Sequence, residues 1–165
     1  MKILLVVLGG LICVIVVVVI VGALLPKSHT ASRTAIIKST PEQVFALISG
    51  PQDWRTDLKE YKFFDENGRH MQRETDKDGQ TITYEIVQSQ PPTLRKTAIA
   101  DKSLPFGGSW TWSIQPQSEG CAVTITEQGE VYNPVFRFVS RFILGHTRTI
   151  DKYLAMLGEA ATHGK

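Results

Sequence analysis

His146 is the side chain of this 165-residue protein best suited to move a proton, because an imidazole titrates near neutral pH. It lies near the middle of an apolar stripe in the segment that follows Asn133-Pro134. Two roles are open for it. His146 can orient a ligand or act as a general base, or it can be a structural histidine that bonds to a strand hydroxyl or a backbone carbonyl. The sequence places no carboxylate or nucleophile beside it, so we assign no catalytic residue.

The other titratable residues show no catalytic or metal-binding spacing. His29, His70 and His163 are isolated from one another and from His146. Glu85 and Glu127 fall in predicted strands, on the face that we expect to lie opposite the apolar side chains, which argues against a paired acid–base site. The sequence contains no glycine-rich phosphate loop and no nucleophile elbow. We therefore expect no metal and no cofactor.

Aromatic side chains provide a second set of candidates. Large rings with a polar tip suit a lipophilic ligand that carries one or two oxygens, although a plain aromatic core would give the same pattern. The predicted ligand-binding residues are Tyr84, Trp110, Trp112 and Tyr132, followed by Phe142, Ile143, His146 and Ile150 of the C-terminal segment.

Two further features allow both a functional and an ordinary interpretation. Leu104 and Phe106 place apolar bulk on a loop that Pro105 and two glycines make bendable, so this loop could cover a cavity mouth or dip into a membrane. It could also be a turn whose Phe106 packs on the core. A basic stripe on the C-terminal helix could face anionic headgroups or simply face water. Its members are Arg137, Arg141, Arg148 and Lys152.

Capping signals and periodicity predict the elements that must position these residues. Residues 33–38 form a first strand, and Thr40-Pro41-Glu42-Gln43 is a capping box that opens a short helix. Gly50-Pro51 ends this helix, and Pro51 can open a second short helix that continues through Trp54 and Leu58.

Period-two patterns and tight turns then predict an antiparallel meander. Its strands are expected at residues 61–65, 71–76, 81–87, 94–100, 108–114 and 121–131. Asn133-Pro134 opens one long helix that runs to about residue 161. At 100° per residue, its apolar side chains form a single stripe, with the basic stripe on the opposite side.

This order of elements resembles the START-like or SRPBCC superfamily, which includes polyketide cyclase/dehydrase-type and Bet v 1-like proteins. The similarity rests on residues 35–45, on Asp53-Trp54 and on Pro134 at the start of the last helix. It implies an α+β helix-grip fold, in which a curved antiparallel sheet wraps around a long C-terminal helix and two short helices follow the first strand. It also implies an elongated apolar cavity between sheet and helix. These marks support a fold and assign no chemistry.

The N-terminal segment is a predicted membrane anchor. Residues 3–25 contain no charge and, as a helix, would be roughly 34 Å long, enough for a hydrocarbon core of about 30 Å. A cleaved signal peptide is the alternative, but its apolar region usually has about 7–15 residues. We therefore expect an anchor and polar linker at residues 1–32 and a START-like domain at residues 33–162. The flanking charges are nearly balanced, and we place the domain on the non-cytoplasmic side of a plasma or inner membrane.

Composition narrows the remaining choices. A net charge of +2 and the absence of a basic run argue against nucleic acid as a partner. Cys121 is the only thiol outside the apolar segment, so the domain cannot form an internal disulfide. The oligomeric state is not indicated.

The predicted function is membrane-anchored binding of a lipophilic small molecule, such as a lipid, an isoprenoid or a polyketide-like compound. Two alternatives remain open at this point. One is a cyclase or dehydratase that uses His146 as its acid or base, and the other is an accessory module that binds a membrane protein.

Overall fold

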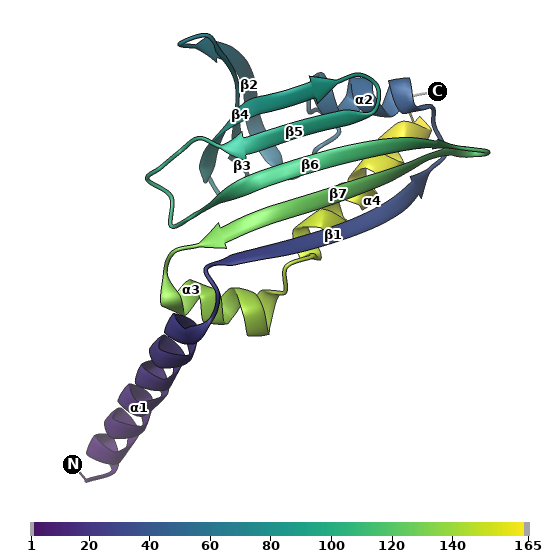
Figure 1. Cartoon of the computed structure of the whole chain (residues 1–165). Helices are drawn as coiled ribbons and strands as arrows, with labels where there is room; N and C mark the ends of the chain where they lie inside the picture. Colours follow the sequence, from purple (N-terminus) through teal and green to yellow (C-terminus); the bar gives the residue numbers. More distant parts are fainter. Residues whose placement is uncertain (1, 164–165) are drawn as a thin grey trace.

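The structure is a computed structural model, and it describes residues 2–163. Seven antiparallel strands form one curved sheet, and α2 and α4 lie on one face of it (Figure 1). The elements are α1 (Lys2–Leu24), β1 (Ser28–Ile37), α2 (Pro41–Ser49), β2 (Leu58–Glu66), β3 (Arg69–Asp76), β4 (Thr81–Gln90), β5 (Leu94–Ile99), β6 (Phe106–Gln117), β7 (Gly120–Val131), α3 (Pro134–Val139), the π-helical turn η1 (Ser140–Leu144) and α4 (Arg148–His163).

The predicted meander is confirmed. The strand order is β1-β7-β6-β5-β4-β3-β2, so each strand from β2 to β7 pairs with its sequence neighbour. β1 joins the end of this meander by pairing with β7, from Ser28 opposite Glu130 to Ile37 opposite Cys121. β1 therefore begins at Ser28, five residues before the predicted start, and most of the expected polar linker belongs to the sheet.

The hydrophobic core lies between the sheet and the two helices α2 and α4. Burial of the core side chains holds α4 against β1 and β7, because apolar area removed from water stabilises the fold by about 25 cal/mol per Å². Its buried members include Ile37, Val44, Phe45, Ile48, Trp112, Ile114, Cys121, Val123, Ile125, Ile150, Leu154 and Leu157.

The predicted capping box of α2 is confirmed, but the prediction of a second short helix that begins at Pro51 is wrong. The Thr40 side chain accepts from the backbone N–H of Gln43, and the Gln43 side chain accepts from the backbone N–H of Thr40. Residues 51–57 form turns instead of a helix. Their side chains cap the end of α2, because Gln52 and Trp54 both donate to the Leu47 carbonyl oxygen. The chain then enters β2 at Leu58.

The prediction of a single long C-terminal helix is also wrong. The chain forms α3, then the π-helical turn η1, then a break at residues 145–147 before α4. The Gly145 N–H bonds to the Ser140 carbonyl oxygen, and Gly145 adopts φ 72° and ψ 162°, a region that is nearly restricted to glycine. The π-helical turn and the break rotate the first part of the predicted apolar stripe away from α4. Phe142 and Ile143 therefore do not share a face with Ile150.

α1 projects from the domain at the end where α3 lies (Figure 1). In the part of the chain that the structure describes, α1 is the one helix that is long and apolar enough to cross a membrane. Of its residues, only Gly22 is buried, and it lies against Pro134 at the start of α3.

Arg137 belongs to the basic stripe that was predicted to face either anionic headgroups or water, and both interpretations are wrong for this residue. Its side chain is buried between α3 and the end of α1. One guanidinium nitrogen, Nη1, donates to the carbonyl oxygens of Gly22 and Leu25, both at 3.1 Å. The other, Nη2, donates to the Tyr132 carbonyl oxygen at 3.1 Å. The last carbonyl groups of a helix have no partner within it, so Arg137 caps α1 and fixes its position against α3.

Candidate ligand-binding site

A cavity lies between α4 and the sheet, but it is small and partly polar rather than elongated and apolar. Its volume is about 40 Å³, close to that of one water molecule in the liquid, about 30 Å³. The residues that line it are Ile48, Gln52, Arg55, Gln72, Glu74, Tyr84, Arg95, Thr97, Trp110, Trp112 and Tyr153.

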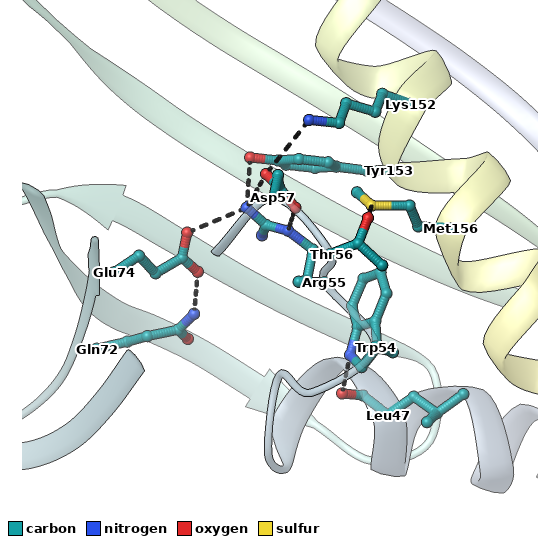
Figure 2. A network of polar contacts seen from close by, with 10 residues as sticks. All are labelled: Leu47, Trp54, Arg55, Thr56, Asp57, Gln72, Glu74, Lys152, Tyr153 and Met156. Atoms are coloured by element: carbon teal, nitrogen blue, oxygen red, sulfur yellow. Dashed lines mark hydrogen bonds and ion pairs between the residues drawn. The ribbon is translucent and has the colours of Figure 1, made fainter. Parts of the chain in front are cut away.

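Arg55 is the centre of a polar network at one side of this cavity (Figure 2). Its guanidinium binds Asp57 through two hydrogen bonds, with Nε–Oδ1 at 2.8 Å and Nη2–Oδ2 at 2.9 Å. Nη2 also donates to the Tyr153 hydroxyl at 2.9 Å and lies 3.5 Å from the Glu74 carboxylate. The guanidinium carbon sits 4.0 Å from the centre of the Tyr153 ring. Arg55 thus ties the turn after α2 to β3 and α4.

The pKa values of the two carboxylates in this network are shifted in opposite directions. Burial would raise the pKa of Asp57, but the hydrogen bonds and charge of Arg55 outweigh it and hold that pKa below its ordinary value. Burial dominates for Glu74, whose pKa is raised, because its opposing contacts are weaker. Burial also raises the pKa of the Tyr153 hydroxyl, so this group stays protonated and can donate a hydrogen bond.

Arg95 of β5 is the second buried guanidinium that lines this cavity, with only 4% of its surface exposed. Its Nη2 donates to the Gln72 side chain at 2.7 Å, and Gln72 in turn donates to Glu74. Among residues 2–163, no ion pair joins Arg95 directly to a carboxylate. Burial lowers the pKa of Arg95, although a guanidinium remains charged near neutral pH. Arg95 therefore brings a positive charge and several hydrogen-bond donors to the cavity.

Aromatic rings also line the cavity. The ring of Tyr153 on α4 lies 5.4 Å from Trp110 and 6.4 Å from Trp112, measured between ring centres, and it is nearly parallel to Trp112. Tyr84 of β4 lines the same cavity, and burial raises the pKa of its hydroxyl well above the ordinary value. The site therefore combines flat apolar surfaces with guanidinium donors.

The structure brings three of the predicted ligand-binding residues together and separates the others. Tyr84, Trp110 and Trp112 line the cavity. Ile150 is fully buried in the core beside it. The remaining candidates, which lie outside the cavity lining, are Tyr132, Phe142 and Ile143, all of them exposed, together with His146 and the half-buried Leu104 and Phe106. Phe106 is the first residue of β6 and pairs with Val131 instead of standing on a free loop.

His146 lies in the break between η1 and α4, so its predicted place on a continuous helix face is wrong. Its ring stacks on that of His29 at 3.8 Å between ring centres, so the expectation that these two histidines are isolated from each other is wrong. The Nδ1 atom of His146 lies 3.2 Å from the Ser140 hydroxyl. Burial and the charge of Arg141 lower the pKa of His146. Burial, followed by the effect of His146, lowers the pKa of His29.

Glu127 faces inward, so the expectation that it lies opposite the apolar side chains is also wrong. Residues two apart on a strand share a face, and Glu127 follows Val123 and Ile125 on β7. Its Oε1 lies 3.7 Å from Nε2 of His29. Burial raises the pKa of Glu127 to about 7. Glu127, His29 and His146 thus form a second polar cluster, although no group of three such residues within 2–163 is arranged to hold a metal ion.

Comparison with known proteins identifies the fold. Residues 28–160 match the family model described as "Polyketide cyclase / dehydrase and lipid transport". The chain shows no match among curated protein sequences.

Several solved structures share the fold at low sequence identity. A norcoclaurine synthase point mutant from Thalictrum flavum, in complex with a transition-state analogue, matches with a TM-score of 0.63 and 10% identity, over 83% of this chain and 96% of that one. Protein MLL2253 from Mesorhizobium loti matches with a TM-score of 0.64 and 14% identity, over 83% and 99% of the two chains. The di-domain ARO/CYC protein StfQ of the steffimycin biosynthetic pathway matches with a TM-score of 0.63 and 12% identity, over 82% of this chain and 52% of that one.

Proposed function

Since this chain belongs to the polyketide cyclase/dehydrase and lipid transport family, we propose that it is a membrane-anchored protein that binds an amphipathic small molecule between α4 and the sheet. The ligand would have an apolar, ring-containing or chain-like body and one oxygen-rich polar group. The observation that carries this proposal is Arg95, a buried guanidinium that faces a cavity and has no carboxylate partner of its own among residues 2–163.

The membrane part of the proposal rests on α1. Its 23 residues would extend over roughly 34 Å, and its apolar side chains are exposed along its length instead of packing into the domain. Exposed apolar surface of this extent is unfavourable in water and favourable in a lipid bilayer, where a helix satisfies all of its own backbone groups.

The ligand-binding part rests on the composition of the interior. A buried charge costs several kcal/mol of desolvation, and a well-packed apolar core of the same volume would often be more stable. Arg95 and Gln72 provide donors for a carboxylate, phenolate or carbonyl oxygen. Trp110, Trp112 and Tyr153 provide the flat apolar surface for the rest of the ligand.

Binding requires the interior to open, because typical ligand cavities measure about 300–1,000 Å³ and this one about 40 Å³. The break before α4 provides a place for such movement. Gly145 is exposed, and nothing lies within 4 Å of the position that its Cβ would occupy. A rotation of α4 about this break would carry Tyr153 away from Trp110 and enlarge the cavity.

The test compares two fluorescent probes that differ in charge. 1-Anilinonaphthalene-8-sulfonate carries an anionic group on an aromatic body, and N-phenyl-1-naphthylamine is its neutral counterpart. Full-length protein in a nonionic detergent is titrated with each probe, and binding is measured as energy transfer from tryptophan. We expect Arg95→Met to weaken binding of the sulfonate by about 10- to 100-fold, the scale of a lost charged hydrogen bond, and to change binding of the neutral probe little.

The matched control is Lys96→Met, which removes a charge from the next residue of β5, on the opposite face of the sheet. Arg95→Lys, which retains the charge but loses the planar guanidinium, should fall between wild type and Arg95→Met. Circular dichroism establishes that each variant is folded. Equal loss of both probes in Arg95→Met, or sulfonate binding that remains unchanged, would refute the assignment of Arg95 as the polar contact.

A further inference from the structure

The segment formed by α3 and η1 exposes five large apolar side chains in a short stretch of chain: Val135, at 39%, and four others that are more than half exposed. Phe136, Phe142, Ile143 and Leu144 have 53%, 59%, 68% and 52% of their surfaces exposed, and we refer to them as the apolar ridge. Single exposed apolar residues are common on soluble domains, but neighbouring large ones usually mark a contact with a partner or a membrane.

The apolar ridge is held where α1 ends. α3 crosses the C-terminal end of α1 (Figure 1), and Gly22 of α1 lies directly against Pro134 of α3. Arg137 fixes this arrangement through its hydrogen bonds to the Gly22 and Leu25 carbonyl oxygens. If α1 crosses the hydrocarbon core, the ridge must therefore lie at the level where the chain leaves that core.

The charges near the ridge suit an anionic surface. The sequence has no aspartate or glutamate from Tyr132 to Ile150, and it has three arginines in the same stretch. Arg137 is used as the cap of α1, whereas Arg141 and Arg148 are exposed. Interfacial segments combine apolar side chains that enter the headgroup–acyl boundary with cationic side chains that contact anionic headgroups.

We propose that the apolar ridge inserts into the interfacial layer of an anionic bilayer and docks the domain on the membrane beside α1. This inference rests on the membrane anchor in the proposed function and adds a second, peripheral contact with the same bilayer. Gly145 joins the ridge to α4, which covers the candidate ligand-binding site. The docked segment is thus continuous with the helix that has to move for the site to open.

The test measures the depth of a fluorescent label in full-length protein reconstituted into vesicles of phosphatidylcholine and phosphatidylglycerol. Cys13 is replaced by alanine, Cys121 remains because it is fully buried, and an environment-sensitive label is attached through Leu144→Cys. The control label is attached through Ser118→Cys, an exposed position in the turn between β6 and β7 at the other end of the sheet (Figure 1). Phospholipids that carry a nitroxide group near the headgroup serve as the quencher.

We expect the label at position 144 to emit at shorter wavelength than the label at position 118 and to be quenched by the nitroxide lipids. Ile143→Asp should return the label at position 144 to water, since a carboxylate opposes insertion. Ile36→Asp is the matched control, because Ile36 is similarly exposed, at 61%, on β1. This control should leave the label shielded.

Each contrary result has a distinct meaning. Protein that floats with the vesicles but carries a hydrated, unquenched label at position 144 would overturn membrane docking and leave the anchor intact. A label that is shielded without quenching, together with cross-linking between copies at that position, would replace docking with self-association. Protein that remains outside the floated fraction would overturn the anchor, and docking beside it would fall with it.

Discussion

Glu127 and His29 allow a sharp test of how burial sets charge in this fold. Their side chains approach to 3.7 Å, the geometry of an ion pair, yet burial raises the pKa of Glu127 to about 7 and lowers that of His29. Desolvation thus favours the neutral form of each partner. We predict that near pH 7 the two side chains do not form a stable ion pair, and that Glu127→Gln, which is neutral and of similar size, stabilises the protein at higher pH.

The expected magnitude follows from the pKa of Glu127. A rise from 4.5 to about 7 corresponds to about 3.4 kcal/mol at 1.36 kcal/mol per pKa unit. Because the Glu127 side chain is 21% exposed, solvent screening reduces this figure, and we expect about 2 kcal/mol. A carboxyl group with a raised pKa contributes stability that is fully present below pH 4.5 and is lost as the pH rises through about 7. The wild type and Glu127→Gln should therefore be equally stable near pH 4.5 and differ most near pH 8.

The assay is thermal unfolding of full-length protein in nonionic detergent between pH 4.5 and 8, followed by tryptophan emission. A gain of about 2 kcal/mol should raise the melting temperature of Glu127→Gln by about 4–8 °C at pH 8. The lowered pKa of His29 acts in the opposite direction, since its contribution is lost as the pH falls through 6.5. His29 is present in both proteins, so their difference reports on Glu127.

Glu130→Gln is the matched control, because Glu130 lies on the same strand and is exposed. The difference in stability between Glu130→Gln and wild type should not depend on pH in the way expected for Glu127→Gln. The reasoning is refuted if Glu127→Gln is less stable than wild type at pH 7–8. That result would mean that Glu127 is ionised and that its ion pair with His29 outweighs the cost of desolvation.

Two glycines allow further predictions. Gly145→Ala should destabilise the protein by about 1–3 kcal/mol, since alanine is strained at its φ and ψ, and this loss is measured by thermal unfolding. Gly22→Ala should separate α1 from α3, because its Cβ would collide with the Pro134 carbonyl group, and trypsin should then cleave faster after Lys27. Gly9→Ala is the control, because the corresponding Cβ meets nothing within 4 Å, and an equal cleavage rate in the two variants would contradict the prediction.

The sequence predicted well those parts of the fold that depend on local patterns. Period-two alternation placed the strands, and the capping box placed α2, because both signals act between residues that are close in sequence. The C-terminal helix could not be predicted in this way. A helical stripe follows from sequence only if every residue turns by 100°, and the π-helical turn with Gly145 breaks that regular rotation.

The candidate site depended on contacts across the fold, and the sequence analysis missed its main residues. Arg55, Glu74 and Arg95 come from a turn and from two strands that β4 separates, so no short spacing connects them. One signal was available. Gln72 and Glu74 alternate along β3, as do Arg95 and Thr97 along β5, so each pair places its polar side chains on one face. The inward face of this sheet is polar at that point, whereas the sequence-based prediction treats inward faces as apolar.

Arg55, Glu74 and Arg95 also constrain what the interior can bind. A purely apolar ligand would displace any water from the Arg95 guanidinium and leave its remaining donors without partners, at a cost of about 1–3 kcal/mol for each unsatisfied group and more when the group is charged. A purely polar ligand would leave the faces of Trp110 and Trp112 without apolar contact. A molecule with one oxygen-rich end and an apolar body satisfies both surfaces at once. Such molecules concentrate at the interface of a bilayer. In the functions proposed above, α1 and the apolar ridge hold the domain at the same interface.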